Sequence, residues 1–241
     1  AKMLRFRHND MTHLASLLQP HSGLIISEGV FSMDGDQAPC QQLADLAKQS
    51  GNWLMLDDAH GIGVLGEQGR GTLSHQGVAS DSVHIRMATF GKALGVAGAF
   101  VGGSRQLTDY LLNFSRDYVY STHMPPAQAY AISAAIAWVK QADEERAHLQ
   151  SLIRQFRDGI TGLGLAAAES STAIQPLIIG DADKAVSVAN KLRERGLWVT
   201  AIRPPTVPKG TARLRITLTA AHQSSDISLL LNALKESVTD V

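Results

Sequence analysis

Apolar and polar positions alternate in the first half of the chain with the periods of short strands and helices. Four apolar runs are predicted as strands, namely 23–30, 53–60, 83–91 and 98–103. Between the first two, Leu43, Leu46 and Ala47 recur at helical spacing, and Gly51 is a residue type that commonly ends a helix. This order of elements predicts a mostly parallel α/β sheet with a ligand site at the carboxyl ends of its strands.

A long helical pattern joins the two halves of the chain. A helix is predicted over 105–114, and after Pro125 and Pro126 an Ala-rich helical pattern continues to residue 160, with a break expected near Asp143. A helix of this length exceeds what one compact domain usually holds. We therefore interpret it as a connection between two domains.

Beyond residue 164 the pattern changes to short alternating elements. The predicted elements are strands at 173–180, 197–202 and 212–219 and helices at 181–196 and 224–238. They indicate a small α+β lobe. We expect part of a large α/β domain at 1–140, and the connecting helix with the small C-terminal α+β domain at 141–241.

The composition is that of an ordinary globular protein. Of the 241 residues, 22 are Lys or Arg and 22 are Asp or Glu, so the basic excess of a nucleic-acid binder is missing. Cys40 is the only cysteine, which excludes a disulfide framework and favours the cytoplasm. The uncharged run 118–139 contains a Pro pair and polar residues, so we expect no membrane-spanning helix there.

The glycines at 61–66 match the G-x-G-x-x-G fingerprint of dinucleotide-binding proteins. That fingerprint requires a helix directly after the glycines, because pyrophosphate binds at the N-terminus of the helix. The next residues, EQGRGTLSHQG, contain three more glycines and have no helical period. We interpret the segment as a glycine-rich surface loop, and a nicotinamide-dependent enzyme is the alternative.

The run WLMLDDAHG places Asp57, Asp58 and His60 at the carboxyl end of a predicted strand. Side chains alternate along a strand, so Asp57 and His60 reach one site only if the chain bends after Asp57. They could be metal ligands, but no third ligand stands at a usable spacing, and we predict no metal. The ordinary interpretation of any one of them is a structural polar group at a strand end, and the third alternative is a site that includes Lys92.

Lys92 follows an apolar run and lies between Gly91 and Gly95. A surface lysine is the ordinary interpretation of such a residue. The flanking glycines, however, allow a bulky group to approach the backbone, and a desolvated lysine has the reactivity that a Schiff-base amine needs. A strand-end Asp57 followed by this lysine is the arrangement of pyridoxal-phosphate enzymes of the aspartate-aminotransferase fold type.

Five motifs resemble the α-oxoamine synthase family of class II aminotransferase-like proteins, namely SEGVFSMDGDQAP, LMLDDAHGIGVLGEQGRG, ATFGKALG, YSTHMPPAQA and RPPTVPKGTARLRITLTAAH. They cover the chain from about residue 24 to residue 222. The resemblance implies the pyridoxal-phosphate transferase fold type I and a homodimer with its sites at the interface.

The resemblance also implies a role for each matching residue around pyridoxal 5'-phosphate. Lys92 would bind the cofactor covalently and later act as the base at the substrate α-carbon. Asp57 would pair with the pyridine nitrogen and keep the ring protonated. His60 and Ser32 would lie near the phenolic oxygen of the ring, and Thr89 would donate to the phosphate.

Further roles concern the phosphate and the substrate. Ser121 and Thr122 resemble a phosphate contact that crosses from the partner subunit. Arg215 would hold the carboxylate of the amino acid, a task that suits a planar two-pronged donor. Thr206 would contact the substrate, and Arg203 would receive the distal carboxylate of a pimeloyl chain.

The implied reaction is a decarboxylative condensation of an amino acid with an acyl thioester. The intact stretch 203–215 favours L-alanine with pimeloyl-CoA or pimeloyl-carrier protein, a step of biotin synthesis. The siblings glycine C-acetyltransferase, 5-aminolevulinate synthase and serine palmitoyltransferase share the same core and remain alternatives. An inactive fragment or interaction module is the alternative from another class.

The first residues, AKMLRFRHND, have neither an initiator Met nor the apolar core of a signal peptide. Family members carry a sizeable N-terminal portion before the region that matches Ala1. We therefore expect a fragment that exposes apolar surface and sheet edge, and that binds the cofactor weakly or not at all.

Overall fold

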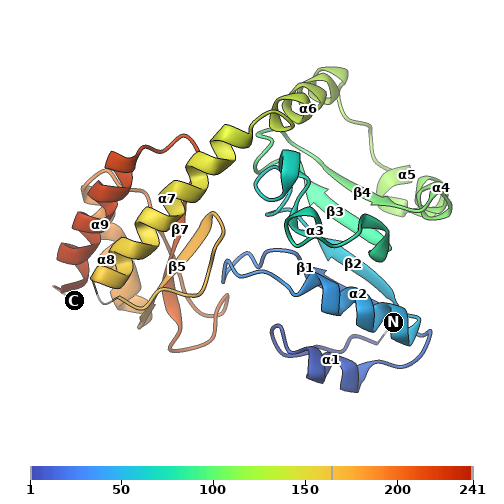
Figure 1. The fold of residues 1–241 in the computed structure, drawn as a ribbon, viewed down its shortest axis with the longest axis horizontal. Helices are drawn as coiled ribbons and strands as arrows, with labels where there is room; N and C mark the ends of the chain where they lie inside the picture. Colours follow the sequence, from blue (N-terminus) through green and yellow to red (C-terminus); the bar gives the residue numbers. More distant parts are fainter. Residues whose placement is uncertain (1, 164, 240–241) are drawn as a thin grey trace. The chain divides into compact units, whose positions relative to one another are not determined.

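The computed structural model describes residues 2–163 and 165–239 and divides the chain into two compact units (Figure 1). The first unit consists of residues 1–30 and 37–143, and the second of residues 31–36 and 144–241. The short segment 31–36 therefore belongs with the C-terminal half of the chain. The sequence pattern did not indicate that this segment is part of the second unit.

The first unit is built on a four-stranded sheet. Its strands are β1 (Leu24–Glu28), β2 (Trp53–Asp57), β3 (Ile85–Thr89) and β4 (Ala99–Gly103), and they lie side by side in this order. β1, β2 and β3 are parallel, and β4 is antiparallel to β3. The predicted strands and the mostly parallel sheet are confirmed. Because Glu28 pairs with Asp57 and Asp57 pairs with Met87, the carboxyl ends of the three parallel strands lie at one edge.

Besides the 3-10 helices η1 (Glu67–Gly69) and η2 (Ser80–Ser82), the first unit contains α-helices. They are α1 (Met11–Leu17), α2 (Cys40–Ser50), α3 (Thr72–His75), α4 (Arg105–Phe114), α5 (Arg116–Val119) and α6 (Pro126–Val139). α2 packs against β2 through Leu43, Ala44 and Ala47, and Gly51 ends it in the left-handed conformation, as its position predicts. Cys40, the first residue of α2, is buried, and this burial raises the pKa of its thiol to about 12.

The long helical pattern is interrupted where the break was expected. α6 ends at Val139, and α7 (Asp143–Gly162) begins three residues after Lys140. Leu149, Leu152, Ile153, Phe156 and Ile160 form the buried stripe of α7 at helical spacing. No helix within 2–163 and 165–239 has the length and apolar character that crossing a bilayer requires.

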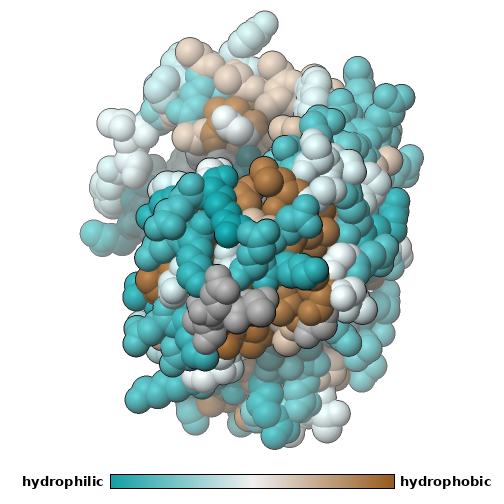
Figure 2. Space-filling view, turned by 90° about the vertical axis from the view of Figure 1, so that its left-hand side faces the viewer, coloured by the Kyte–Doolittle hydropathy of each residue, from teal (hydrophilic) through white to brown (hydrophobic). Residues whose placement is uncertain are grey.

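The second unit contains a three-stranded antiparallel sheet. Its strands are β5 (Ile174–Gly180), β6 (Thr200–Ile202) and β7 (Ala212–Thr217), in the order β5-β7-β6. α8 (Ala182–Glu194) packs on all three strands and on α9 (Ser224–Thr239). The Asp181 side chain accepts from the backbone N–H groups of Asp183 and Lys184, which confirms the predicted capped helix. The face seen in Figure 2 is mainly hydrophilic, with a smaller hydrophobic area between the polar residues.

The first unit exposes apolar side chains on regular elements, as expected. In β1, Leu24 and Ile26 are 46% and 57% exposed, whereas Ile25 on the opposite face is buried. In α6, the only buried side chains among the described residues are Ile132 and Val139, although the helix is mostly apolar. Apolar side chains of β1 and α6 therefore lie on the surface of the first unit.

Candidate active site

The chain turns sharply where β2 ends. Asp57 is the last residue of the strand, and its Oδ1 accepts a hydrogen bond from the backbone N–H of Ala59 at 2.9 Å. The N–H groups of Gly61 and Ile62 both donate to the carbonyl of Asp58 at 3.0 Å. This turn supplies the bend that the sequence required if Asp57 and His60 were to serve one site.

His60 and Lys92 come together in the first unit. Lys92 lies in the turn between β3 and β4, and its Nζ is 2.9 Å from Nε2 of His60. An ammonium group has only donors, so it bonds to this nitrogen when the imidazole is neutral there. Lys92 is exposed and His60 is half-buried, so the dry surroundings expected for the lysine are not present. The pair can hold and exchange a proton between two nitrogen atoms.

Thr89 stabilises the turn that carries Lys92. Its Oγ1 donates to the carbonyl of Gly98 at 2.9 Å and accepts from the N–H of Gly91 at 3.1 Å. Gly98 also accepts from the N–H of Phe90 at 2.9 Å, so the hydroxyl closes the base of the turn. The proton of the hydroxyl is thereby used within the turn, and donation to a phosphate requires this bond to open.

Ser121 and Thr122 follow α5 on the surface of the first unit. Both residues are exposed, and the Ser121 hydroxyl donates to the carbonyl of Asp117. The phosphate contact implied for these two residues crosses a subunit interface, and such a contact requires exposed side chains.

The second unit carries the four remaining predicted site residues. Arg215, on β7, donates from Nε to the carbonyl of Ser32 at 2.7 Å and from Nη1 to Thr217 Oγ1 at 3.2 Å. Burial lowers the pKa of Arg215. Arg203 and Thr206 are exposed in one turn, in which the N–H of Thr206 donates to the carbonyl of Arg203 at 3.0 Å.

Asp58 is a structural centre that the sequence analysis did not single out. Its carboxylate is almost fully buried and accepts from Thr72 Oγ1 at 2.5 Å and from the N–H of Thr72 at 3.0 Å. Arg86 Nη2 lies 3.4 Å from the same group. Burial raises the pKa of Asp58 against the opposing effect of these three donors. The available signal was the second acidic residue at a strand end followed by a glycine-rich loop.

The glycines of the loop pack around this carboxylate. A Cβ at Gly61 or at Gly71 would lie 2.0 Å from an Asp58 oxygen, so neither position has room for a side chain. Only a three-residue 3-10 helix, η1 (Glu67–Gly69), follows the G-x-G-x-x-G pattern directly, and α3 begins at Thr72 and has four residues, so the described residues place no α-helix at this point. The loop interpretation is confirmed, but the loop is not simply superficial, since Leu65 is 2% exposed. These glycines allow close packing within the protein.

Comparison with known proteins identifies relatives of the whole chain. The model of the family "Aminotransferase class I and II" matches residues 1–234. The 8-amino-7-oxononanoate synthases of Aeromonas salmonicida and Serratia proteamaculans are 66% and 55% identical over 233 and 239 residues. These alignments cover 97% and 98% of this chain but 58% and 62% of the relatives, so the chain spans about three fifths of their length.

Solved structures of serine palmitoyltransferases have the same fold. The enzyme of Sphingomonas wittichii is 32% identical with a TM-score of 0.94, over 100% of this chain and 61% of that chain. A variant from S. paucimobilis with a bound PLP–myriocin aldimine is 29% identical with a TM-score of 0.93, over 100% of this chain and 63% of that one. These likenesses confirm the predicted fold class, the pyridoxal-phosphate transferase fold type I. By its sequence match and by its fold, the chain belongs to the aminotransferase class I and II family.

Proposed function

We propose that this chain carries the catalytic lysine of a pyridoxal-phosphate-dependent acyltransferase, the 8-amino-7-oxononanoate synthase of biotin synthesis. The contact of 2.9 Å between Lys92 Nζ and His60 Nε2, beside the strand that ends at Asp57, is the observation that carries the proposal. The 66% identity to a relative of that name supports the choice within the family.

The donor set fits pyridoxal phosphate. It offers a primary amine in contact with an imidazole, a carboxylate at a neighbouring strand end, and hydroxyls for a phosphate. When bound, the cofactor takes up the electron pair that is left when a bond to the substrate α-carbon breaks. In our proposal the Asp57 carboxylate would pair with the pyridine nitrogen. Thr89, and Ser121 and Thr122 from the partner subunit, hold the phosphate.

Lys92 and His60 handle the protons of the reaction in this proposal. A lysine nucleophile must lose a proton before its nitrogen can bond to carbon. His60 Nε2, at 2.9 Å, is placed to accept that proton or to hold the amine in its direction. When Lys92 Nζ is neutral and not bonded to carbon, it would remove the proton of the substrate α-carbon. We also assign His60 to the phenolic oxygen of the cofactor ring.

The substrate roles fall to the second unit. A guanidinium group can present two parallel N–H donors to a carboxylate, and Arg215 is half-buried, where such a pair gains strength. We assign Arg215 to the carboxylate of L-alanine. The exposed turn with Thr206 and Arg203 is assigned to the acyl donor, pimeloyl-CoA or pimeloyl-carrier protein, whose distal carboxylate suits Arg203.

We further propose that the protein acts as a homodimer in the cytoplasm. The exposed apolar side chains of α4, α5 and α6 support this, since Tyr110, Phe114, Tyr118 and Tyr130 are each more than 60% exposed. We expect light scattering to give twice the mass of the chain, 25.8 kDa, and exchange of Phe114 and Tyr130 for serine to shift it toward the monomer. A monomer for the unchanged chain contradicts the proposal.

An assay of substrate preference tests the proposed reaction. Release of coenzyme A from pimeloyl-CoA is measured with L-alanine, glycine or L-serine in the presence of pyridoxal phosphate. We expect L-alanine to be preferred at least about tenfold, which corresponds to roughly 1.4 kcal/mol of differential binding. The ratio of the rates with the three amino acids tests the proposal, because we expect a low absolute rate from this chain. Preference for glycine or serine favours a sibling enzyme, and no rate with any of the three favours the inactive fragment.

A further inference from the structure

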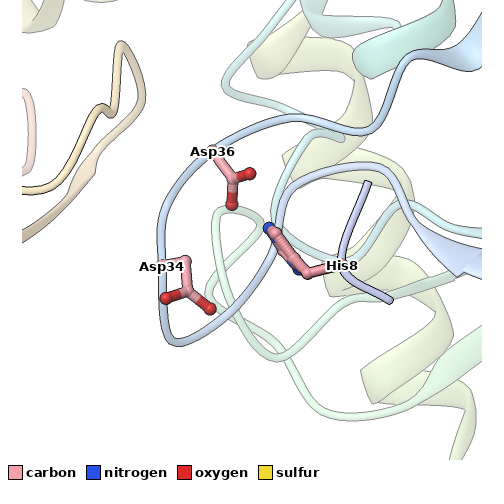
Figure 3. A group of neighbouring side chains, drawn as sticks. All are labelled: His8, Asp34 and Asp36. Carbon is pink, nitrogen blue, oxygen red and sulfur yellow. The ribbon is translucent and has the colours of Figure 1, made fainter. Parts of the chain in front are cut away.

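The segment 31–36, with the sequence FSMDGD, forms a tight loop within the second unit. The N–H of Phe31 donates to the carbonyl of Asp36 at 2.9 Å, and the N–H of Gly35 donates to the carbonyl of Phe31 at 2.8 Å. Figure 3 shows Asp34 and Asp36 on this loop. The loop is the centre of the motif SEGVFSMDGDQAP, in which the family resemblance implies a role only for Ser32.

Gly35 is held against the start of β5. Its carbonyl accepts from Thr172 Oγ1 at 2.9 Å, and Ser170 Oγ lies 2.9 Å from the same oxygen. Both hydroxyl residues are buried, with Thr172 2% and Ser170 4% exposed. A Cβ on Gly35 would lie 2.3 Å from the carbonyl oxygen of Ile174, and its φ of +71° favours glycine. The hydrogen bonds to the Gly35 carbonyl and the close packing of the Gly35 backbone therefore fix one end of the loop.

Two arginines of β7 hold the other end. Arg213 and Arg215 are two residues apart in the strand, so their side chains leave the same face. Arg213 Nη1 is 2.6 Å from Asp34 Oδ1 and donates to the carbonyl of Met33 at 3.2 Å. Arg215 Nε donates to the carbonyl of Ser32 at 2.7 Å. Three consecutive loop residues are thus bound by two neighbouring guanidinium groups.

The two arginines differ in whether the guanidinium group is already paired with a carboxylate. The Arg213 side chain is 7% exposed and is already paired with Asp34, with its Nε donating to the carbonyl of Thr211 at 3.1 Å. Its charge is compensated within the unit, so it does not compete for an incoming carboxylate. Arg215 is fixed at Nε by Ser32 and has no carboxylate partner among the ion pairs described for the two ranges 2–163 and 165–239. A guanidinium group that is held by hydrogen bonds to Ser32 and Thr217 but lacks a counter-charge is suited to receive an anion.

We propose that Arg213 is a positioning residue. Its ion pair with Asp34 fixes the loop 31–36, so that the Ser32 carbonyl holds the Arg215 guanidinium in the orientation that receives the carboxylate of the amino-acid substrate. The substrate part of this inference rests on the proposed function, whereas the positioning part concerns only residues of the second unit.

The positioning part is tested on the unliganded chain by exchange of the Arg215 Nε–H, followed by nuclear magnetic resonance. Arg213→Lys keeps the charge but loses the fork, and Asp34→Asn removes the counter-charge at a side chain that is 43% exposed and tolerates change. We expect the Arg215 Nε–H to exchange with solvent about tenfold faster in both variants than in the unchanged chain. The matched control is Arg195→Lys, whose exposed ion pair with Glu236 lies in the same unit and should leave that rate unchanged.

The substrate part is tested by titrating the chain, loaded with pyridoxal phosphate, with L-alanine. We expect the apparent Kd to rise about tenfold in Arg213→Lys and Asp34→Asn, while reductive labelling of Lys92 stays at the level of the unchanged chain. An unchanged Nε–H exchange rate in both variants overturns the positioning role. Faster exchange together with no response of the unchanged chain to L-alanine supports the positioning role and refutes the proposed substrate.

Discussion

Replacing Lys92 with alanine is expected to abolish covalent attachment of pyridoxal phosphate to the chain. Lys92 Nζ is the amine that contacts His60 Nε2 at 2.9 Å, and only a nitrogen that can shed its proton forms a Schiff base. Borohydride reduction traps even a short-lived bond, so the experiment works at weak affinity. We expect labelling of the peptide that contains residue 92 to fall by at least about a hundredfold, as measured by mass spectrometry.

The matched control for this experiment is Lys48→Ala. Lys48 is exposed on α2, in the same unit as Lys92, and non-specific reduction would label it as readily. Labelling at residue 92 should therefore be unaffected by the Lys48 change. His60→Ala should reduce the labelling of Lys92 less than Lys92→Ala does, because the amine remains. Equal labelling of Lys48 and Lys92 in the unchanged chain would contradict the assigned role.

Replacing Asp58 with alanine is expected to lower the free energy of unfolding of the first unit by about 3–5 kcal/mol. The change leaves the N–H and hydroxyl of Thr72 without their buried acceptor and removes the partner of Arg86. It also opens space where Gly61 and Gly71 now pack. Hydrogen exchange of the amides of β2 in urea measures this stability separately from that of the second unit.

Two further variants separate the carboxylate network from a general loss of packing. Thr72→Val keeps the shape of the side chain but removes one donor, and it should cost about 1–3 kcal/mol. Asp45→Ala removes a carboxylate that is exposed on α2 and should stay within about 0.5 kcal/mol of the unchanged chain. If Asp58→Ala matches Asp45→Ala, the buried carboxylate does not stabilise the loop.

Local patterns predicted the strands and the longer helices of both units, but not α1, α3 and α5. The spacing of Leu43 and Ala47 with Gly51 predicts α2 and its end, and the apolar runs predict all four strands of the first sheet. These signals are local, because the period of buried side chains and the preference of glycine for positive φ act within a few residues. The break before Asp143 follows from the polar residues there in the same way.

The candidate site was only partly accessible from the sequence. Asp57, His60 and Lys92 could be proposed because the chemistry of each residue type and its place at a strand end or turn are visible in one dimension. The roles of Asp58 and Arg213 could not be predicted, because each depends on a partner at least 14 residues away in the sequence. Asp34, the partner of Arg213, is 179 residues away. Both side chains are buried, and their hydrogen bonds hold together segments that are distant in the sequence.

The sequence by itself determined the order of the strands and helices, the absence of a disulfide framework and the family, since these depend on local periodicity, on composition and on contiguous motifs. Only the tertiary structure decided that His60 meets Lys92 and that segment 31–36 belongs with residues 144–241. The physical reason is that a hydrogen bond or ion pair acts over about 3 Å in space. The turn after β2, the turn between β3 and β4 and the face of β7 determine which groups come within that distance. A linear sequence does not record these arrangements.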